Sequence, residues 1–124
     1  MSKEIQPLNQ DEEFEEALTE AKANSTTAYV HHFKKPFEYQ GQTYDHLTFD
    51  FEKLTGKDSL SVEAELQAKG IMLMVPTFSG PYLIRIAARA CQEQIGSDAL
   101  EQMRIADYSK IRSQARNFLL SSEQ

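Results

Sequence analysis

The chain has 124 residues and a formal net charge of −6, with 40% hydrophobic and 26% charged residues. This length predicts one domain, and this balance is typical of a soluble globular fold rather than a disordered chain. No apolar run reaches the ~18 residues that a membrane span needs, and no apolar signal-peptide core opens the sequence. The single cysteine excludes an internal disulfide framework and a cysteine-rich zinc site. We therefore expect a cytoplasmic protein with no membrane partner.

The negative charge is concentrated at the start of the chain. Residues 1–25 contain seven acidic residues and two lysines, whereas residues 26–124 contain twelve acidic and eleven basic residues and are nearly neutral. Nucleic acid is therefore not an expected partner, because its phosphates would repel this segment and no dense basic stripe compensates.

The acidic segment also contains a helical pattern. Over about 11–23, apolar residues recur at positions i, i+3, i+4 and i+7, which predicts one narrow stripe made of Phe14, Ala17, Leu18 and Ala21. We interpret residues 1–25 as an acidic N-terminal arm with a helix. It is a plain surface helix, an arm that binds a partner, or a disordered segment.

Residues 27–51 predict an antiparallel β-hairpin. The sequence Gln40-Gly41-Gln42 predicts its turn, and Pro36 predicts a bulge or an edge position in the first strand. In the second strand, apolar residues alternate with polar ones, which predicts a buried face that carries Leu47, Phe49 and Phe51.

Helices are expected to follow this hairpin and to cover its apolar face. Their predicted ranges are about 57–69, 80–95, 98–103 and 107–119. Residues 26–124 then form a single α+β domain, with Ser79 and Asp107 as the predicted N-caps of the second and the last of these helices.

The core contacts of the first predicted helix are expected from Leu60, Ala64 and Leu66. The segment 71–75 that follows is too short for a helix, and it is expected as a third strand or a buried connector. Its two methionines, Met72 and Met74, are interpreted as side chains that fill gaps in the core.

The titratable residues form no catalytic constellation, so we expect a protein that is not an enzyme and has no cofactor or metal. His31 and His32 are adjacent and point to opposite faces of a strand. A two-histidine site of His31 and His46, with Asp45 or Asp50, is the weaker alternative to ordinary strand histidines.

The lone thiol is not expected to react. Cys91 lies on the apolar face of its predicted helix, and a buried, inert thiol is the expected state. No nucleophile elbow and no glycine-rich phosphate loop is present.

Partner binding is the remaining class of function. The pairs Arg85/Arg89 and Arg112/Arg116 are spaced i, i+4, so each lies on one helix face. Such a face is either solvated or binds an acidic segment, including the N-terminal arm of this chain. The candidate partner-binding residues, most of them also expected in the core, are Tyr82, Arg85, Ile86, Arg89, Ile111, Phe118 and Leu119.

Several short motifs over residues 33–119 resemble one known family. They are Pro36-Phe37, Gly41, Tyr44 and Leu47-Thr48-Phe49 in the hairpin, Leu54-Thr55-Gly56 with Asp58 at the helix start, and Asp107-Tyr108 with Phe118-Leu119 in the last helix. This layout resembles the tail assembly chaperones of long-tailed bacteriophages and related prophages.

The resemblance implies a non-enzymatic helper in the host cell. Such proteins bind the aggregation-prone tape measure protein, help to recruit tail tube protein subunits and are absent from the finished virion. A longer form made by ribosomal frameshifting is common in the family. The alternatives are a virion structural or adaptor protein that self-associates into a ring, and a small regulatory subunit.

Overall fold

The computed structural model describes residues 28–122, which form an α+β domain. A two-stranded antiparallel hairpin, β1 (Tyr29–Tyr39) and β2 (Gln42–Phe49), precedes all the helices of this part. The helices are α2 (Gly56–Ala68), α3 (Gly80–Ala90), α4 (Ser97–Glu101) and α5 (Ile105–Ser122), with short 3₁₀ turns η1 (Phe51–Lys53) and η2 (Pro76–Phe78). The predicted N-terminal helix and acidic arm lie outside the described residues. Within residues 28–122, no helix has both the length and the apolar character needed to cross a membrane.

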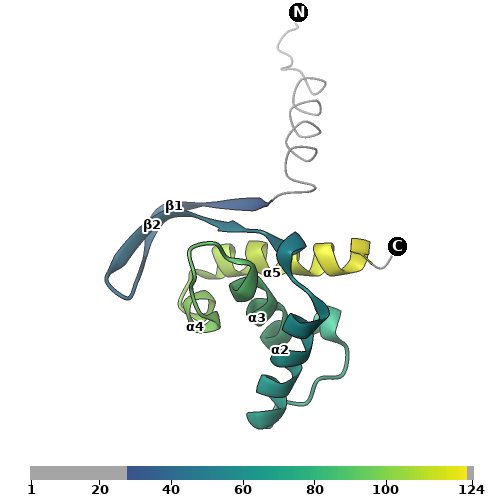
Figure 1. Ribbon diagram of the computed structural model, residues 1–124. Coiled ribbons are helices and arrows are strands. Elements are labelled where there is room, and N and C mark those ends of the chain that lie inside the picture. The colour runs from purple at the N-terminus through teal and green to yellow at the C-terminus, as the bar shows by residue number, and fades with distance from the viewer. Residues whose placement is uncertain (1–27, 123–124) are drawn as a thin grey trace, which may run out of the picture.

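The predicted hairpin and its bulge are confirmed. Gln40 and Gly41 form the turn with φ values of 51° and 81°, and positive φ at both central residues matches the twist of the flanking strands. The strand register is interrupted between His32 and Phe37, which places the irregularity around Pro36. In Figure 1 the hairpin lies across the helices, and its turn extends beyond them.

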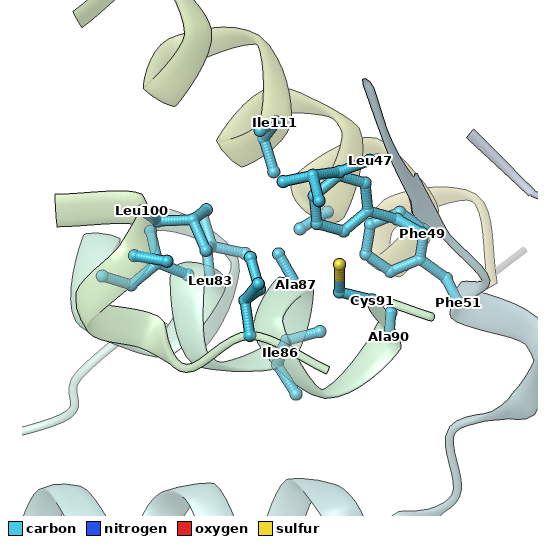
Figure 2. Close-up of a cluster of buried hydrophobic side chains, with 14 of the residues drawn as sticks. Leu47, Phe49, Phe51, Leu83, Ile86, Ala87, Ala90, Cys91, Leu100 and Ile111 are labelled. Carbon is cyan, nitrogen blue, oxygen red and sulfur yellow. The ribbon is translucent and has the colours of Figure 1, made fainter. Parts of the chain in front are cut away.

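The predicted apolar face of the second strand forms part of the core. Leu47 and Phe49 are fully buried, and Phe51 is buried too, although β2 ends at Phe49 and Phe51 begins η1. Figure 2 shows these side chains in one buried cluster with residues of α3, Leu100 and Ile111, with Leu47 next to Ile111. A lone hairpin is marginal in water, so this burial stabilises it.

Helix α3 is the central element of the domain. It contacts α2, α4, α5 and β2, and Figure 1 shows it among the other helices. Its predicted N-cap is confirmed, since the Ser79 side chain accepts a hydrogen bond from the Tyr82 backbone N–H at 3.3 Å. Pro81 stands in the first turn, where its missing N–H is not needed.

The predicted end of this helix at residue 95 is wrong, because α3 ends at Ala90. Cys91 forms an antiparallel bridge with Phe49. The Asp50 N–H donates to the Ala90 carbonyl at 2.8 Å, and the Gln92 N–H donates to the Thr48 carbonyl at 2.8 Å. Pairing with the end of β2 therefore replaces the last helical turns.

Two of the three core contacts predicted for α2 are wrong. Leu60 is 66% exposed and Ala64 is exposed, whereas Val62 and Leu66 are fully buried. Residues two apart on a helix are separated by about 200°. Leu60 and Ala64 therefore share the solvent face, opposite Val62 and Leu66.

The segment 71–75 is an irregular connector rather than a third strand. Its side chains alternate, since Ile71 and Leu73 pack against the core while Met72 and Met74 are 81% and 79% exposed. The prediction that both methionines fill the core is therefore wrong. Ile71 and Leu73 occupy the side of the connector that faces the domain.

The last two helices differ from their predicted bounds. Helix α4 is Ser97–Glu101 rather than 98–103, and α5 begins at Ile105 and continues to Ser122. Asp107 is therefore not the N-cap of α5 but lies in its first turn. Its carboxylate binds His31 of β1 instead.

The orientation of α2 can be tested with one substitution at two positions of the same helix. We expect Leu66→Ala to lower the free energy of unfolding by about 2–5 kcal/mol, because it leaves a cavity in the core. The matched control Leu60→Ala removes the same atoms from the exposed face and should change stability by less than about 0.5 kcal/mol. Urea denaturation measures both, and similar losses would contradict the assigned orientation.

Candidate partner-binding surface

Three of the seven candidate partner-binding residues lie in the core. Tyr82 is 4% exposed, Ile86 2% and Ile111 fully buried. The Tyr82 hydroxyl also forms a 2.6 Å hydrogen bond with the Ser59 hydroxyl of α2. Their burial stabilises the domain and leaves their side chains no surface for a partner in this conformation.

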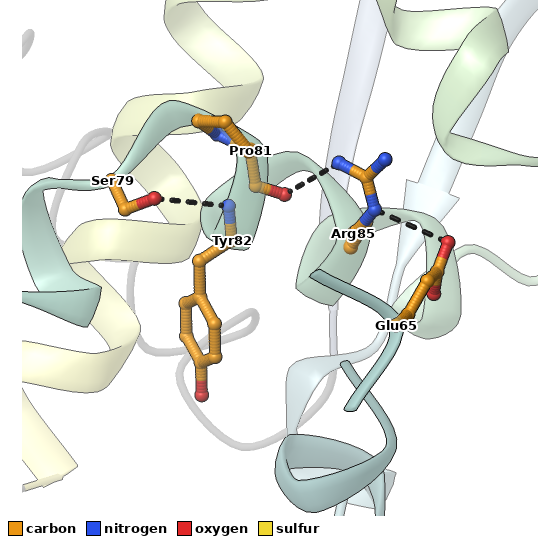
Figure 3. A network of polar contacts seen from close by, with 5 residues as sticks. All are labelled: Glu65, Ser79, Pro81, Tyr82 and Arg85. Carbon is orange, nitrogen blue, oxygen red and sulfur yellow. Dashed lines mark hydrogen bonds and ion pairs between the residues drawn. The ribbon is translucent and has the colours of Figure 1, made fainter. Parts of the chain in front are cut away.

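The two arginines of α3 join this helix to α2. Arg85 is buried; its Nε donates to Glu65 at 3.2 Å and its Nη1 donates to the Pro81 carbonyl at 3.0 Å (Figure 3). Arg89 donates from Nη1 to Asp58 at 2.9 Å. An acidic partner would therefore have to compete with carboxylates of the same domain.

Asp58 links this ion pair to the start of α2. The Thr55 backbone N–H donates to its carboxylate at 2.9 Å. This hydrogen bond, together with Arg89, holds the pKa of Asp58 below its ordinary value. The carboxylate therefore serves both the N-cap of α2 and its contact with α3.

The last two candidates, Phe118 and Leu119, are half-buried and pack against the core from α5. The Phe118 ring stacks on Phe51, with centroids 5.5 Å apart. Each offers only part of its surface to a partner. The same holds for Arg89, whose side chain is 39% exposed.

A run of exposed apolar side chains was not predicted. Four large apolar side chains within seven residues of the α2–α3 connector are exposed, namely Met72 (81%), Met74 (79%), Val75 (51%) and Phe78 (64%). We call these four residues the connector surface. Exposed apolar side chains are ordinary when scattered singly, but when gathered they are typical of an interaction site. The signal in the sequence was the pair of methionines between two helices.

A buried polar chain connects β1 to α5. His31 is 2% exposed; its Nε2 lies 2.7 Å from Asp107 Oδ1, and its Nδ1 lies 2.9 Å from the Tyr29 hydroxyl. Burial and the charge of Asp107 raise the pKa of Tyr29, which disfavours a nucleophilic phenolate. The arrangement suits a structural cross-link rather than an activated nucleophile.

The weaker alternative of a His31–His46 metal site is not formed. His31 pairs with Leu47, while His46 lies opposite His32. Since side chains alternate along a strand, this register separates His31 from His46. Among residues 28–122, no three histidine, cysteine or acidic residues lie close enough together to bind one metal ion.

The predicted burial of Cys91 is confirmed. The side chain is 2% exposed, and its Sγ lies 3.4 Å from a Glu93 carboxylate oxygen. Burial raises the pKa of Cys91 to about 12, so the thiol is protonated at neutral pH.

Comparison with known proteins gives no match: no family model, no curated protein and no solved structure is similar to this chain.

The cross-link between β1 and α5 predicts a measurable loss of stability when one of its partners is removed. We expect Asp107→Ala to lower the free energy of unfolding by about 1–3 kcal/mol, because the buried His31 loses the partner of its Nε2. The control Asp45→Ala, at an exposed position of β2, should change it by less than about 0.5 kcal/mol. Chemical denaturation checks both variants, and an unaffected Asp107→Ala protein would rule out the cross-link.

The raised pKa of Cys91 predicts that the domain loses stability at alkaline pH. The unfolded Cys91 ionises from its ordinary pKa of 9.0 and the folded thiol only near pH 12, so the unfolded state loses its proton first as pH rises. The stability that the buried, protonated thiol contributes is complete below pH 9 and is lost progressively toward pH 12. Urea titrations at pH 8.5 and 10.5 should therefore show a smaller stability difference between wild type and Cys91→Ala at the higher pH. A difference that does not change with pH would contradict the burial of the thiol.

Proposed function

We propose that this chain is a non-enzymatic assembly chaperone of a long-tailed bacteriophage or prophage. It binds the tape measure protein in the host cytoplasm, keeps that protein soluble and helps to recruit tail tube subunits. The observation that carries the proposal is the connector surface, four exposed apolar side chains in one short segment of a domain whose core is complete without them.

The chemistry of the connector surface suits a helical partner. Two of its four residues are methionines, whose flexible thioether side chains adapt to partners of different shape. An amphipathic helix can cover such an area with its apolar face. Long apolar helices are what a tape measure protein presents before it is assembled, according to the family resemblance.

The motif residues behind the resemblance have definite structural roles, and this supports its use. Gly41 supplies positive φ in the hairpin turn. Asp58 accepts from the Thr55 N–H at the start of α2, and Phe118 of α5 stacks on Phe51. The order of hairpin, helices and closing helix follows the layout that the resemblance implies.

The charge of the chain also favours a chaperone. Residues 1–25 contain an excess of five negative charges. A net charge far from zero keeps a protein and its complexes in solution, which is useful when the partner is apolar. The proposal therefore combines an apolar binding area with a charged, solubilising segment.

The proposal predicts a gain of solubility in co-expression. The tape measure protein encoded beside this chain should be more soluble when the chain is present. The triple variant Met72→Ser/Met74→Ser/Phe78→Ser should lose this effect and bind about tenfold more weakly or worse, since buried apolar anchors carry most of the binding energy. Sedimentation and pull-down of the co-expressed pair measure both.

The control for this experiment is Leu120→Ser, which removes an exposed apolar side chain from the C-terminal part of α5. It should leave solubility and binding unchanged. Circular dichroism should show that the triple variant keeps the fold of the wild type. An equally insoluble tape measure protein with and without the chain would refute the chaperone. Recovery of the chain from purified particles would instead favour the ring-forming virion protein.

A further inference from the structure

We propose that His32 and His46 form a two-imidazole chelate for a divalent transition-metal ion on the hairpin. The two residues lie directly opposite each other in the antiparallel ladder. Both are exposed, and their ring centroids are 5.7 Å apart with an angle of 41° between the planes. His31 is not available for this role, because its two ring nitrogens bind Asp107 and Tyr29.

The distance between the rings is short enough for both imidazoles to reach one metal ion. With metal–nitrogen bonds of about 2.1 Å, two imidazoles on one ion have centroids no more than about 6.4 Å apart. The observed 5.7 Å lies within this limit. Exposed side chains exchange rotamers readily, so the two rings can turn a nitrogen each toward one ion.

The ligand type identifies the class of ion. Neutral imidazole binds Cu²⁺, Ni²⁺ and Zn²⁺ well, and the order of affinities places Cu²⁺ first. Since no group of three ligating residues occurs within residues 28–122, the protein supplies two ligands and water completes the coordination. The site is therefore open, and the ion exchanges with solution.

The position of the histidine pair in the ladder means that a bound ion would also stabilise the hairpin. His32 and His46 are the last matched residues before the register is interrupted, and Phe37 and Tyr44 are the next matched pair. A metal bridge here would join the strands at the edge of the irregular segment. Because the ion binds only the folded pair, it would stabilise the hairpin on both sides of the bulge.

The experiment is a Cu²⁺ titration of the full chain followed by calorimetry and by hydrogen exchange. We expect one equivalent to bind and to slow amide exchange across residues 30–48. His32→Gln and His46→Gln should each weaken Cu²⁺ binding by about tenfold or more. Even mutation of a residue that only hydrogen-bonds to a metal ligand typically lowers metal affinity about 10–100-fold. Circular dichroism of the two exposed-site variants checks that they fold.

Asp45→Asn is the matched control, because it changes an exposed carboxylate next to His46. Its Cu²⁺ affinity should stay within twofold of wild type. A histidine variant that keeps wild-type affinity, or a loss in Asp45→Asn as large as in the histidine variants, would overturn the chelate. Neither histidine belongs to the connector surface, so this outcome is independent of the proposed chaperone activity.

Discussion

The arrangement of the domain depends on the burial of α3 on nearly every side. Seven of its eleven residues are buried, including Arg85, so the elements around it must each supply a matching face. Arg85 adds a directional requirement, because a buried guanidinium without partners is strongly destabilising. Its bond to the Pro81 carbonyl lies within α3, whereas its bond to Glu65 forms only when α2 is docked in the observed position. Apolar burial therefore makes α3 central, and the ion pair fixes its orientation against α2.

The hairpin is attached to this helical body at three separate points along its length. Phe49 pairs with Cys91 after α3, His31 binds Asp107 of α5, and the Tyr39 hydroxyl donates to Asp98 of α4 at 2.9 Å. A two-stranded sheet is weak alone, so these contacts and the buried face of β2 hold it. The register interruption lies between the His31 and Tyr39 attachments, which lets the hairpin bend to reach both α5 and α4.

Much of the fold could be predicted because its signals are local. The period of two at Leu47 and Phe49, the Gln40-Gly41 turn and the Ser79 cap each depend on neighbouring residues alone. The errors occurred where distant residues decide. Apolar residues occur on both faces of α2, so Leu60 and Leu66 look alike in sequence, and only the docking against α3 distinguishes them. After Ala90, Cys91 and Ile95 continue the helical spacing of apolar residues. The pairing of this segment with β2 cannot be read from its own composition.

Core and interface residues are chemically alike, which is why sequence alone could not separate the buried Tyr82 and Ile86 from the exposed Met72 and Phe78. The energetics separate them once the structure is known. Apolar side chains that stay in water contribute little to folding stability, and polar residues at these four positions could join α2 to α3 equally well. The four side chains of the connector surface are therefore not explained by the stability of the domain itself. Gathered exposed apolar side chains are typical of interaction sites, and under the chaperone proposal a partner helix would cover these four.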